Sequence, residues 1–304
     1  MEKLLEQILK DCSRYKSEGR VATYIPELAK ASAEDFGICV IEKDGKVSTA
    51  GDCDKPFTMQ SVVKPLILLL ALEDRGAEAI SRICGVEATG KPFDAFNYSD
   101  RALSCEHINP MINAGAIALC TLVKGYGYDE RFKRLIDLAR KLSGNPNIKV
   151  NEAVYRSESI TGSKNRALAY MLKAYSMIED DVESILEMYF KACSIEVTCR
   201  DLANIAFVLA NHGVSVGGER IVSVEHARHI NAIMTICGMY DGSGEFALNV
   251  GIPAKSGVGG GIMASVPGRM GIGIYSPALD KKGNSLAGVK ALEELSHRID
   301  LSIF

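Results

Sequence analysis

The sequence contains no tryptophan, only nine prolines among 304 residues, and no long hydrophobic run. Its longest uninterrupted apolar stretch, Leu66 to Leu72, has seven residues, whereas a helix that spans a bilayer needs about 20. The first 20 residues mix charged and apolar side chains and lack the continuous apolar core of a signal peptide. We therefore expect a soluble, cytoplasmic protein that does not enter a membrane.

An excess of charge of either sign is also missing. The 35 lysines and arginines nearly balance the 38 aspartates and glutamates, so the net charge is −3 at pH 7 with neutral histidines. Proteins that bind nucleic acid or anionic membranes usually carry a basic surface, and we expect neither as a partner. The content of 47% hydrophobic and 24% charged residues is typical of a globular protein and excludes a disordered chain.

Cysteines in regularly spaced pairs are absent, although the chain has nine cysteines. No C-x-x-C motif occurs, and most cysteines stand among apolar residues, as Cys39, Cys84, Cys120 and Cys237 do. Disulfide frameworks and zinc sites need sets of cysteines at characteristic spacings. The sequence therefore predicts reduced, buried thiols.

The pattern of apolar residues changes from strand to helix and back along the chain. Two short strands are predicted over 36–42 and 46–51, joined by Asp44-Gly45, which is a strong signal for a two-residue hairpin turn. After Gly251, glycines alternate with β-branched residues, which indicates further strands. Helical periodicity covers 3–16, 61–76, 77–84, 114–124, 129–142, 163–177, 182–191, 199–212, 223–236 and 286–298.

These elements predict an α+β fold. Strands near both ends of the chain, with helices between them, indicate one sheet built from N- and C-terminal segments and interrupted by a large all-helical insertion. The hairpin and the close spacing of the late strands favour antiparallel pairing, with the terminal helices flanking the sheet. We expect a single domain over 1–304, with an α/β part over about 1–60 and 246–304 and a helical part over about 61–245.

Three short motifs match known signatures without the context that those signatures need. The G-x-S-x-G pattern at 213–217 follows a helical segment, whereas the serine-hydrolase elbow follows a strand. Residues 85–91 match a phosphate-binding loop up to Pro92, which stands where a magnesium-binding hydroxyl is required. His226 and His229 share one predicted helix face, but no third metal ligand is near them. We assign function to none of the three.

A fourth motif, S-x-x-K at Ser61 and Lys64, lies at the start of the most apolar predicted helix. Residues three apart on a helix are neighbours, and burial at a helix start disfavours the ammonium form, so this lysine could take the serine proton. A second copy, Ser13 and Lys16, lies on a charged helix and is expected at the surface. On this motif alone, a serine helix cap and a lysine extending to solvent explain the pattern equally well.

A glycine-rich segment strengthens the catalytic interpretation. Lys255-Ser256-Gly257 has the chemical types of the K-T-G motif that accompanies S-x-x-K in one group of serine enzymes. The glycines at 259–261 leave backbone groups uncovered, although a turn or bulge would also explain them. A backbone N–H of this strand, together with that of Ser61, would form an oxyanion hole.

With these motifs in this order, the sequence resembles the serine-dependent glutaminase family, whose fold is that of β-lactamases and penicillin-binding proteins. The resemblance implies an enzyme that hydrolyses L-glutamine to L-glutamate and ammonia through a γ-glutamyl-serine intermediate, with no metal or organic cofactor. It runs through most of the chain in seven blocks: TYIPELA (23–29), FTMQSVVK (57–64), NPMINAGAIA (109–118), SESITGSKNRALAY (157–170), YFKACSIEVTCRDLA (189–203), CGMYDGSGEFA (237–247) and SGVGGGIMASVPG (256–268).

The resemblance also implies catalytic roles. Ser61 would be the nucleophile and Lys64 its base. Tyr189 and Tyr240 would stand near the serine, with Tyr240 favoured as the group that relays protons. The backbone N–H of Val258, with that of Ser61, would hold the oxygen of the amide under attack.

Substrate binding is implied for an overlapping set of residues. Glutamine presents an ammonium group, which calls for a carboxylate such as Glu158, and a carboxylate, which calls for amide and hydroxyl donors. The implied binding residues are Tyr24, Ser61, Asn113, Glu158, Asn165, Tyr189, Tyr240 and Val258. The family also suggests a homodimer or a homotetramer.

Pro65 departs from the family pattern, in which a residue other than proline follows the lysine. If Ser61 is the helix N-cap, Pro65 lies in the first turn, where its missing N–H costs little. Proline nevertheless disfavours the α conformation of the residue before it, here Lys64.

Other functions remain open at this stage. An enzyme that recognises β-lactams would share the fold, but its S-D-N motif is missing, since Ser99-Asp100 is followed by Arg101. A non-catalytic amino-acid sensor would keep the pocket and lose the chemistry, which the intact Ser61 and Lys64 argue against. Asparagine is an alternative substrate, because one methylene group provides only about 1–3 kcal/mol of discrimination.

Overall fold

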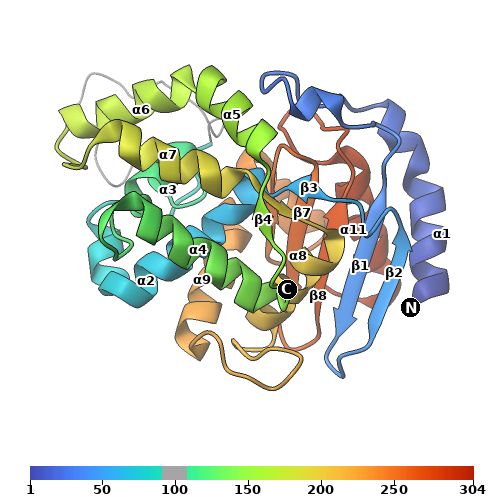
Figure 1. Cartoon of the computed structure of the whole chain (residues 1–304). Helices are drawn as coiled ribbons and strands as arrows, with labels where there is room; N and C mark the ends of the chain where they lie inside the picture. Colours follow the sequence, from blue (N-terminus) through green and yellow to red (C-terminus); the bar gives the residue numbers. More distant parts are fainter. Residues whose placement is uncertain (91–107) are drawn as a thin grey trace.

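The computed structural model describes residues 1–90 and 108–304, and its centre is an antiparallel sheet of five strands (Figure 1). The strands are β1 (Gly37–Glu42), β2 (Val47–Gly51), β6 (Ala254–Ser256), β7 (Gly261–Val266) and β8 (Met270–Tyr275). They lie in the order β2-β1-β8-β7-β6, so that β1 from the N-terminal segment pairs with β8 from the C-terminal segment. The predicted α+β fold with one antiparallel sheet is confirmed.

Helices cover both faces of this sheet. α1 (Glu2–Cys12) and α11 (Leu286–Ile299) lie on one face, and α8 (Cys199–Ala210) lies on the other (Figure 1). Because side chains alternate along a strand, Ile38 and Val40 join the apolar cluster beneath α1 and α11. Cys39 and Ile41 point the opposite way and join the larger cluster that includes α8.

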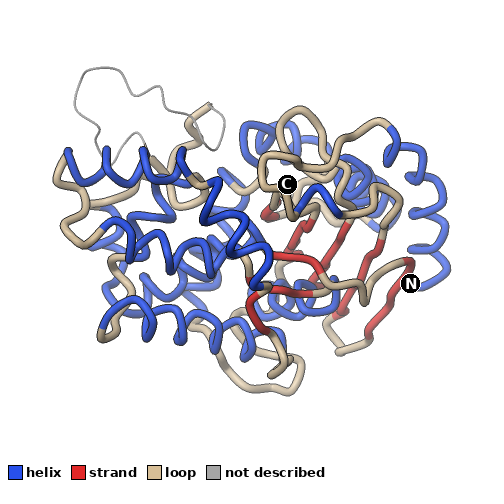
Figure 2. The backbone as a smooth tube through the Cα atoms, turned by 45° about the horizontal axis from the view of Figure 1, so that its top comes forward, coloured by secondary structure: helices blue, strands red, loops and turns tan. Residues whose placement is uncertain are grey.

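A helical part lies beside the sheet (Figure 2). Its helices are α2 (Lys64–Ser81), α3 (Asn113–Cys120), α4 (Gly127–Ser143), α5 (Glu152–Thr161), α6 (Ser163–Ala174), α7 (Val182–Cys193), α9 (Val224–Cys237) and α10 (Ser243–Asn249). A small second sheet, formed by β3 (Phe57–Thr58), β4 (Lys149–Val150) and β5 (Ile195–Val197), has the order β3-β5-β4.

The sequence did not indicate α5, α10 or the small sheet. Strands of two or three residues are too short to show a period. α5 buries only Val154 and Glu158, so it has no apolar stripe from which to recognise a helix.

The start of α2 differs from the prediction. Ser61 is not an N-cap but lies in a 3₁₀ turn, η3 (Gln60–Val63), which leads directly into the α-helix at Lys64. Lys64 adopts the α conformation (φ −57°, ψ −40°) in spite of the following Pro65, because its fully buried surroundings hold it there. The first helical segment of α2 ends at Gly76, as predicted: this residue has a non-helical conformation, with φ 77° and ψ 170°, and a second helical segment follows it to Ser81 across the kink.

Other predictions concern the cysteines and the discarded motifs. The eight cysteines in the described part of the chain are all buried and free, as expected. Residues 213–217 form a loop after α8, without the strand that a nucleophile elbow requires. Three features considered in the sequence lie outside the described residues. They are Pro92 of the phosphate-loop pattern, the ninth cysteine, Cys105, and the segment Ser99-Asp100-Arg101. Among the described helices, none has the length and apolar character needed to cross a membrane.

Two glycines of β8 allow α8 to pack directly on the strand, and we predict that Gly273→Ala destabilises the protein. A Cβ at Gly273 would lie 2.1 Å from the carbonyl oxygen of Cys199 at the start of α8, so the helix must move. The expected loss in the free energy of unfolding is about 2–3 kcal/mol, measured by urea denaturation.

Gly244→Ala is the matched control, because a Cβ at Gly244 in α10 meets no atom within 4 Å. This control should be neutral or slightly stabilising. Equal stability of the two variants would contradict the close packing of α8 on β8.

Candidate active site

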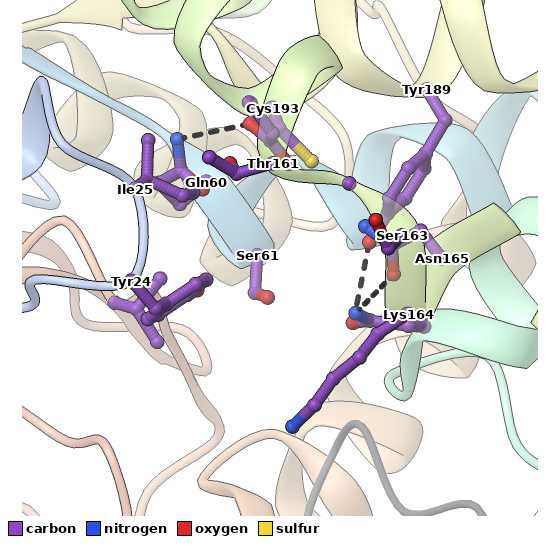
Figure 3. Close-up of a pocket in the computed structure, with 14 residues that line it drawn as sticks. Tyr24, Ile25, Gln60, Ser61, Thr161, Ser163, Lys164, Asn165, Tyr189 and Cys193 are labelled. Carbon is purple, nitrogen blue, oxygen red and sulfur yellow. Dashed lines mark hydrogen bonds between the residues drawn. The ribbon is translucent and has the colours of Figure 1, made fainter. Parts of the chain in front are cut away.

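A pocket of about 330 Å³ lies where η3 meets the helices of the insertion and the turn after β6 (Figure 3). Seven of the nine predicted site residues line it: Tyr24, Ser61, Asn113, Glu158, Asn165, Tyr189 and Val258. The other two, Lys64 and Tyr240, are buried next to the pocket and interact with residues that line it. The fold therefore brings together residues from segments more than 200 positions apart.

The residue before Ser61 has an unusual backbone conformation. The preceding residue, Gln60, has φ 47°, in the left-handed region that side chains other than glycine seldom adopt. Such strain persists only where the surroundings fix it, and it is common at functional sites. The Ser61 side chain faces the pocket in Figure 3, although only 6% of the residue's surface is exposed.

Lys64 is joined to the pocket through Asn113. Its Nζ donates hydrogen bonds to Asn113 Oδ1 at 2.7 Å and to the carbonyl oxygen of Met111 at 3.3 Å. The hydroxyl of Tyr189 donates to the same Asn113 oxygen at 3.3 Å, and Asn113 Nδ2 donates to Asn165 Oδ1 at 2.9 Å. One asparagine therefore sets the positions of an amine, a phenol and a second amide.

Tyr240 also occupies a strained position, with φ 56° at the start of the 3₁₀ turn η5 (Tyr240–Gly242). Burial raises the pKa of its hydroxyl, and hydrogen bonding from the Ser61 hydroxyl and the Val258 N–H lowers it by less. The Tyr240 hydroxyl is thus a neutral donor at physiological pH, next to the Ser61 hydroxyl.

The buried amine of Lys255 packs against the Tyr240 ring. Lys255 Nζ lies 4.4 Å from the centre of the Tyr240 ring and donates to the carbonyl oxygens of Gly238 at 3.0 Å and Ser256 at 2.5 Å. Burial, and to a smaller extent repulsion from Lys64, hold the pKa of Lys255 well below its ordinary value. Lys255 was noted in the K-S-G motif but was not among the predicted site residues.

The turn that carries Val258 approaches Ser61 closely because it begins with glycine. A Cβ at Gly257 would lie 2.6 Å from the carbonyl oxygen of Met59 and 3.4 Å from the backbone nitrogen of Ser61. Only glycine permits this approach. It brings the backbone of the turn against η3, so that Ser61 and Val258 line the same part of the pocket.

Glu158 is the buried carboxyl group of the pocket. Its Oε2 accepts a hydrogen bond from Gln60 Nε2 at 3.4 Å. Burial raises its pKa from 4.5 to about 8, while hydrogen bonds from Gln60 and Cys193 and the charge of Lys64 act in the opposite direction. With a pKa of about 8, most of this carboxyl group is protonated near neutral pH, and a cation in the pocket would favour the charged form.

The pocket also contains residues that the sequence reasoning missed. They are Ile25, Gln60, Thr161, Gly162, Ser163, Lys164 and Cys193. Gln60 directly precedes the nucleophile candidate, and Cys193 follows Tyr189 by four residues on α7, which places both on one helix face. That helical spacing was the available signal for Cys193. In the described residues, no group of three or more His, Cys, Asp or Glu side chains is arranged to hold a metal ion.

Known proteins are similar to this chain in sequence and in fold. A family model described as Glutaminase matches residues 19–304. A protein named Glutaminase from Clostridium tetani is 52% identical over 305 aligned residues, which cover 100% of both chains. The crystal structure of Mglu in its glutamate form has a TM-score of 0.94 and 38% identity, covering 100% of this chain and 69% of that one.

A second solved structure is the covalent complex between the Bacillus subtilis glutaminase YbgJ and 5-oxo-L-norleucine, formed by reaction with 6-diazo-5-oxo-L-norleucine. Its TM-score is 0.91 at 38% identity, and the match covers 100% of this chain and 99% of that one. At this level of identity and coverage, the similarity concerns the whole fold.

We predict that Glu158→Gln makes the ligand-free protein more stable at alkaline pH. The folded state binds the Glu158 proton more tightly than the unfolded chain does, since the pKa is raised to about 8. The free energy of unfolding of the wild type therefore falls as the pH rises between about 5 and about 8, and an amide removes this dependence. Melting temperatures across this range measure the effect.

Glu152→Gln is the matched control, on the same helix but at an exposed position. Its melting curve should follow that of the wild type at every pH. Parallel curves for the wild type and Glu158→Gln would contradict a buried carboxyl with a raised pKa.

Proposed function

The chain belongs to the glutaminase family of L-glutamine amidohydrolases, which have a β-lactamase-like fold, and we propose that it hydrolyses L-glutamine to L-glutamate and ammonia. The observation that carries this proposal is the pocket itself. It combines the Ser61 hydroxyl, the buried Glu158 carboxyl group and, behind the pocket residue Asn113, the buried amine of Lys64 that is hydrogen-bonded to it.

In the proposed complex, the two ends of glutamine bind to different groups. The α-ammonium pairs with the Glu158 carboxylate, which loses its proton when the cation arrives. The α-carboxylate accepts hydrogen bonds from the side chains of Asn113, Asn165 and Tyr189 after these exchange their present partners. Tyr24, which is 55% exposed, lines the same pocket. The side-chain carboxamide is then left at Ser61.

In the acylation step, Ser61 Oγ attacks the carboxamide carbon while Lys64, in its neutral form, accepts the hydroxyl proton. A second buried amine, Lys255, is close enough to repel Lys64, and this repulsion disfavours two positive charges in one site. The negative oxygen of the tetrahedral intermediate is held by the backbone N–H groups of Ser61 and Val258.

Departure of ammonia completes acylation. The C–N bond breaks, and the Tyr240 hydroxyl donates a proton to the leaving nitrogen and is reprotonated from Lys64. The product is a γ-glutamyl ester of Ser61. Water then attacks this ester, with the same groups acting in the reverse order, and glutamate leaves. No step requires a metal or an organic cofactor.

We further propose that residues 1–304 work as one domain, because Ser61 belongs to the helical part and Val258 to the sheet part. The homodimer or homotetramer that the resemblance suggests, and the cytoplasmic location, remain predictions.

Ammonia release tests the reaction and the nucleophile together. Purified protein should release ammonia from L-glutamine, and Ser61→Ala should lower the rate by at least about 10³-fold because the acyl-enzyme cannot form. Ser13→Ala, in the other S-x-x-K sequence, is the matched control and should retain the wild-type rate.

Three other results would contradict the proposal in different ways. Glutamine binding without ammonia release would indicate a sensor, release from L-asparagine alone would change the substrate, and acylation by a fluorescent penicillin would indicate a β-lactam-recognising enzyme. Mass spectrometry after 6-diazo-5-oxo-L-norleucine treatment should find an adduct on the wild type and none on Ser61→Ala.

Tyr240→Phe separates proton transfer from binding. The variant keeps the ring over Lys255 but loses the hydroxyl, so we expect kcat to fall by about 10²–10⁴-fold while glutamate binding, measured by calorimetry, stays near the wild-type value. Tyr275→Phe is the control, since Tyr275 is also buried but stacks on Phe57 outside this pocket. An unchanged kcat for Tyr240→Phe would remove Tyr240 from the mechanism.

A further inference from the structure

The turn that carries Tyr240 has a backbone conformation that its own sequence does not favour. Tyr240 has φ 56°, in the left-handed region, whereas a residue with a large side chain favours a negative φ. In the folded protein the Tyr240 ring packs 4.4 Å from Lys255 Nζ, and this placement follows from the conformation of the turn. Such a conformation persists only where neighbouring groups hold it.

Ser243 holds this turn with a single hydroxyl group. Its Oγ accepts a hydrogen bond from the backbone N–H of Met239 at 3.1 Å and donates one to the carbonyl oxygen of Tyr240 at 2.9 Å. The same carbonyl oxygen accepts a second hydrogen bond from the backbone N–H of Ser243. Ser243, which is only 4% exposed, therefore fixes the backbone on both sides of the Tyr240 Cα atom.

A second buried side chain holds the peptide group that precedes Tyr240. The carbonyl oxygen of Met239 accepts hydrogen bonds from the Gly242 N–H at 3.0 Å and from Asn284 Nδ2 at 3.3 Å. Asn284 is 3% exposed and lies in the loop before α11. The orientation of this peptide group determines φ at Tyr240, so the turn is restrained from α10 and from this loop.

The Ser243 hydroxyl acts on the backbone of the turn and not on a ligand. Fourteen described residues line the pocket, and Ser243 is not one of them. A hydroxyl is suited to its place because it is both a donor and an acceptor. Alanine can do neither, so Ser243→Ala would leave the buried Met239 N–H without its partner, and the turn would gain by changing conformation.

We propose that Ser243 is a positioning residue, whose hydroxyl holds the turn at Tyr240 in its left-handed conformation and so keeps the Tyr240 hydroxyl where it donates a proton to the leaving nitrogen. The role in proton donation rests on the proposed function, whereas the hydrogen bonds between Ser243 and the turn do not.

Steady-state kinetics of Ser243→Ala test the catalytic consequence. A misplacement of about 1 Å can cost about 10²-fold in rate. We therefore expect kcat for glutamine to fall by about 10–100-fold, while KM, and the affinity for glutamate measured by calorimetry, change by less than about threefold. A wild-type kcat would overturn the proposal.

Ser143→Ala is the matched control for loss of a buried hydroxyl. Ser143, the last residue of α4, is also 4% exposed, donates to the carbonyl oxygen of Arg140 at 3.1 Å and accepts from the N–H of Asn145 at 3.1 Å. Both variants should have a lowered melting temperature, but only Ser243→Ala should have a lowered kcat. Lowered melting temperatures with a wild-type kcat in both would leave Ser243 a structural role only.

A double-mutant cycle with Tyr240→Phe tests whether Ser243 acts through the Tyr240 hydroxyl. That hydroxyl is already absent in the Tyr240→Phe background, so adding Ser243→Ala should change kcat by less than about twofold. A double variant in which the two single losses multiply would overturn the proposal, because Ser243 would then act independently of the Tyr240 hydroxyl.

Crystal structures of the ligand-free wild type and Ser243→Ala give a readout that does not depend on turnover. The wild type should keep Tyr240 at a positive φ with its ring against Lys255, and in Ser243→Ala both should change. An unmoved Tyr240 in Ser243→Ala would overturn the role of Ser243, whether or not the protein is active. A wild type that releases no ammonia from glutamine would overturn the proposed function instead, and the two crystal structures would still decide whether Ser243 holds the turn.

Discussion

The contact between the turn after β6 and the backbone of η3 is the constraint on which the site depends. Gly257 lets the turn approach the backbone nitrogen of Ser61, and no larger residue fits between them. Since the turn belongs to the sheet and η3 opens the helical part, this contact joins the two parts at Ser61, the proposed nucleophile. The strained φ angles of Gln60 and Tyr240 occur on either side of it, where packing from both parts holds them.

The site also concentrates buried ionisable groups that reduce stability. Lys64 and Lys255 have no exposed surface, and Glu158 is almost as deeply buried. Each is expensive to remove from water, and the hydrogen bonds to backbone and amide oxygens recover only part of that free energy. The large apolar cluster around α2, α3, α7 and α8 offsets the remainder. In this respect the protein follows a common pattern, in which a functional site departs from the rules that stabilise the rest of the fold.

The features that could be predicted from the sequence are those with long or distinctive residue patterns. Asp44-Gly45 marked the β1–β2 hairpin, and the order of strands and helices indicated the antiparallel sheet with its helical insertion. Ser61 and Lys64 were indicated by the S-x-x-K motif, and the other predicted site residues came from the seven matching blocks rather than from periodicity. The conformation of Lys64 could not be predicted, because it is set by packing that overrides the local effect of Pro65. The supporting roles of Gln60 and Lys255 were missed for a similar reason, since only the folded chain brings them to Glu158 and Tyr240.

The pairing of β1 with β8 has a consequence for synthesis of the protein. Ile38 lies opposite Ile274, so the centre of the sheet pairs a residue that is synthesised early with one that is synthesised late. Such long-range pairing slows folding, because the loop between the partners must close before the contact forms. During translation, β1 and β2 are synthesised before β8, so β1 lacks its second partner strand while the helical part is made. Val258 leaves the ribosome late, so a nascent chain carries Ser61, the proposed nucleophile, for most of its synthesis without its proposed partner in the oxyanion hole.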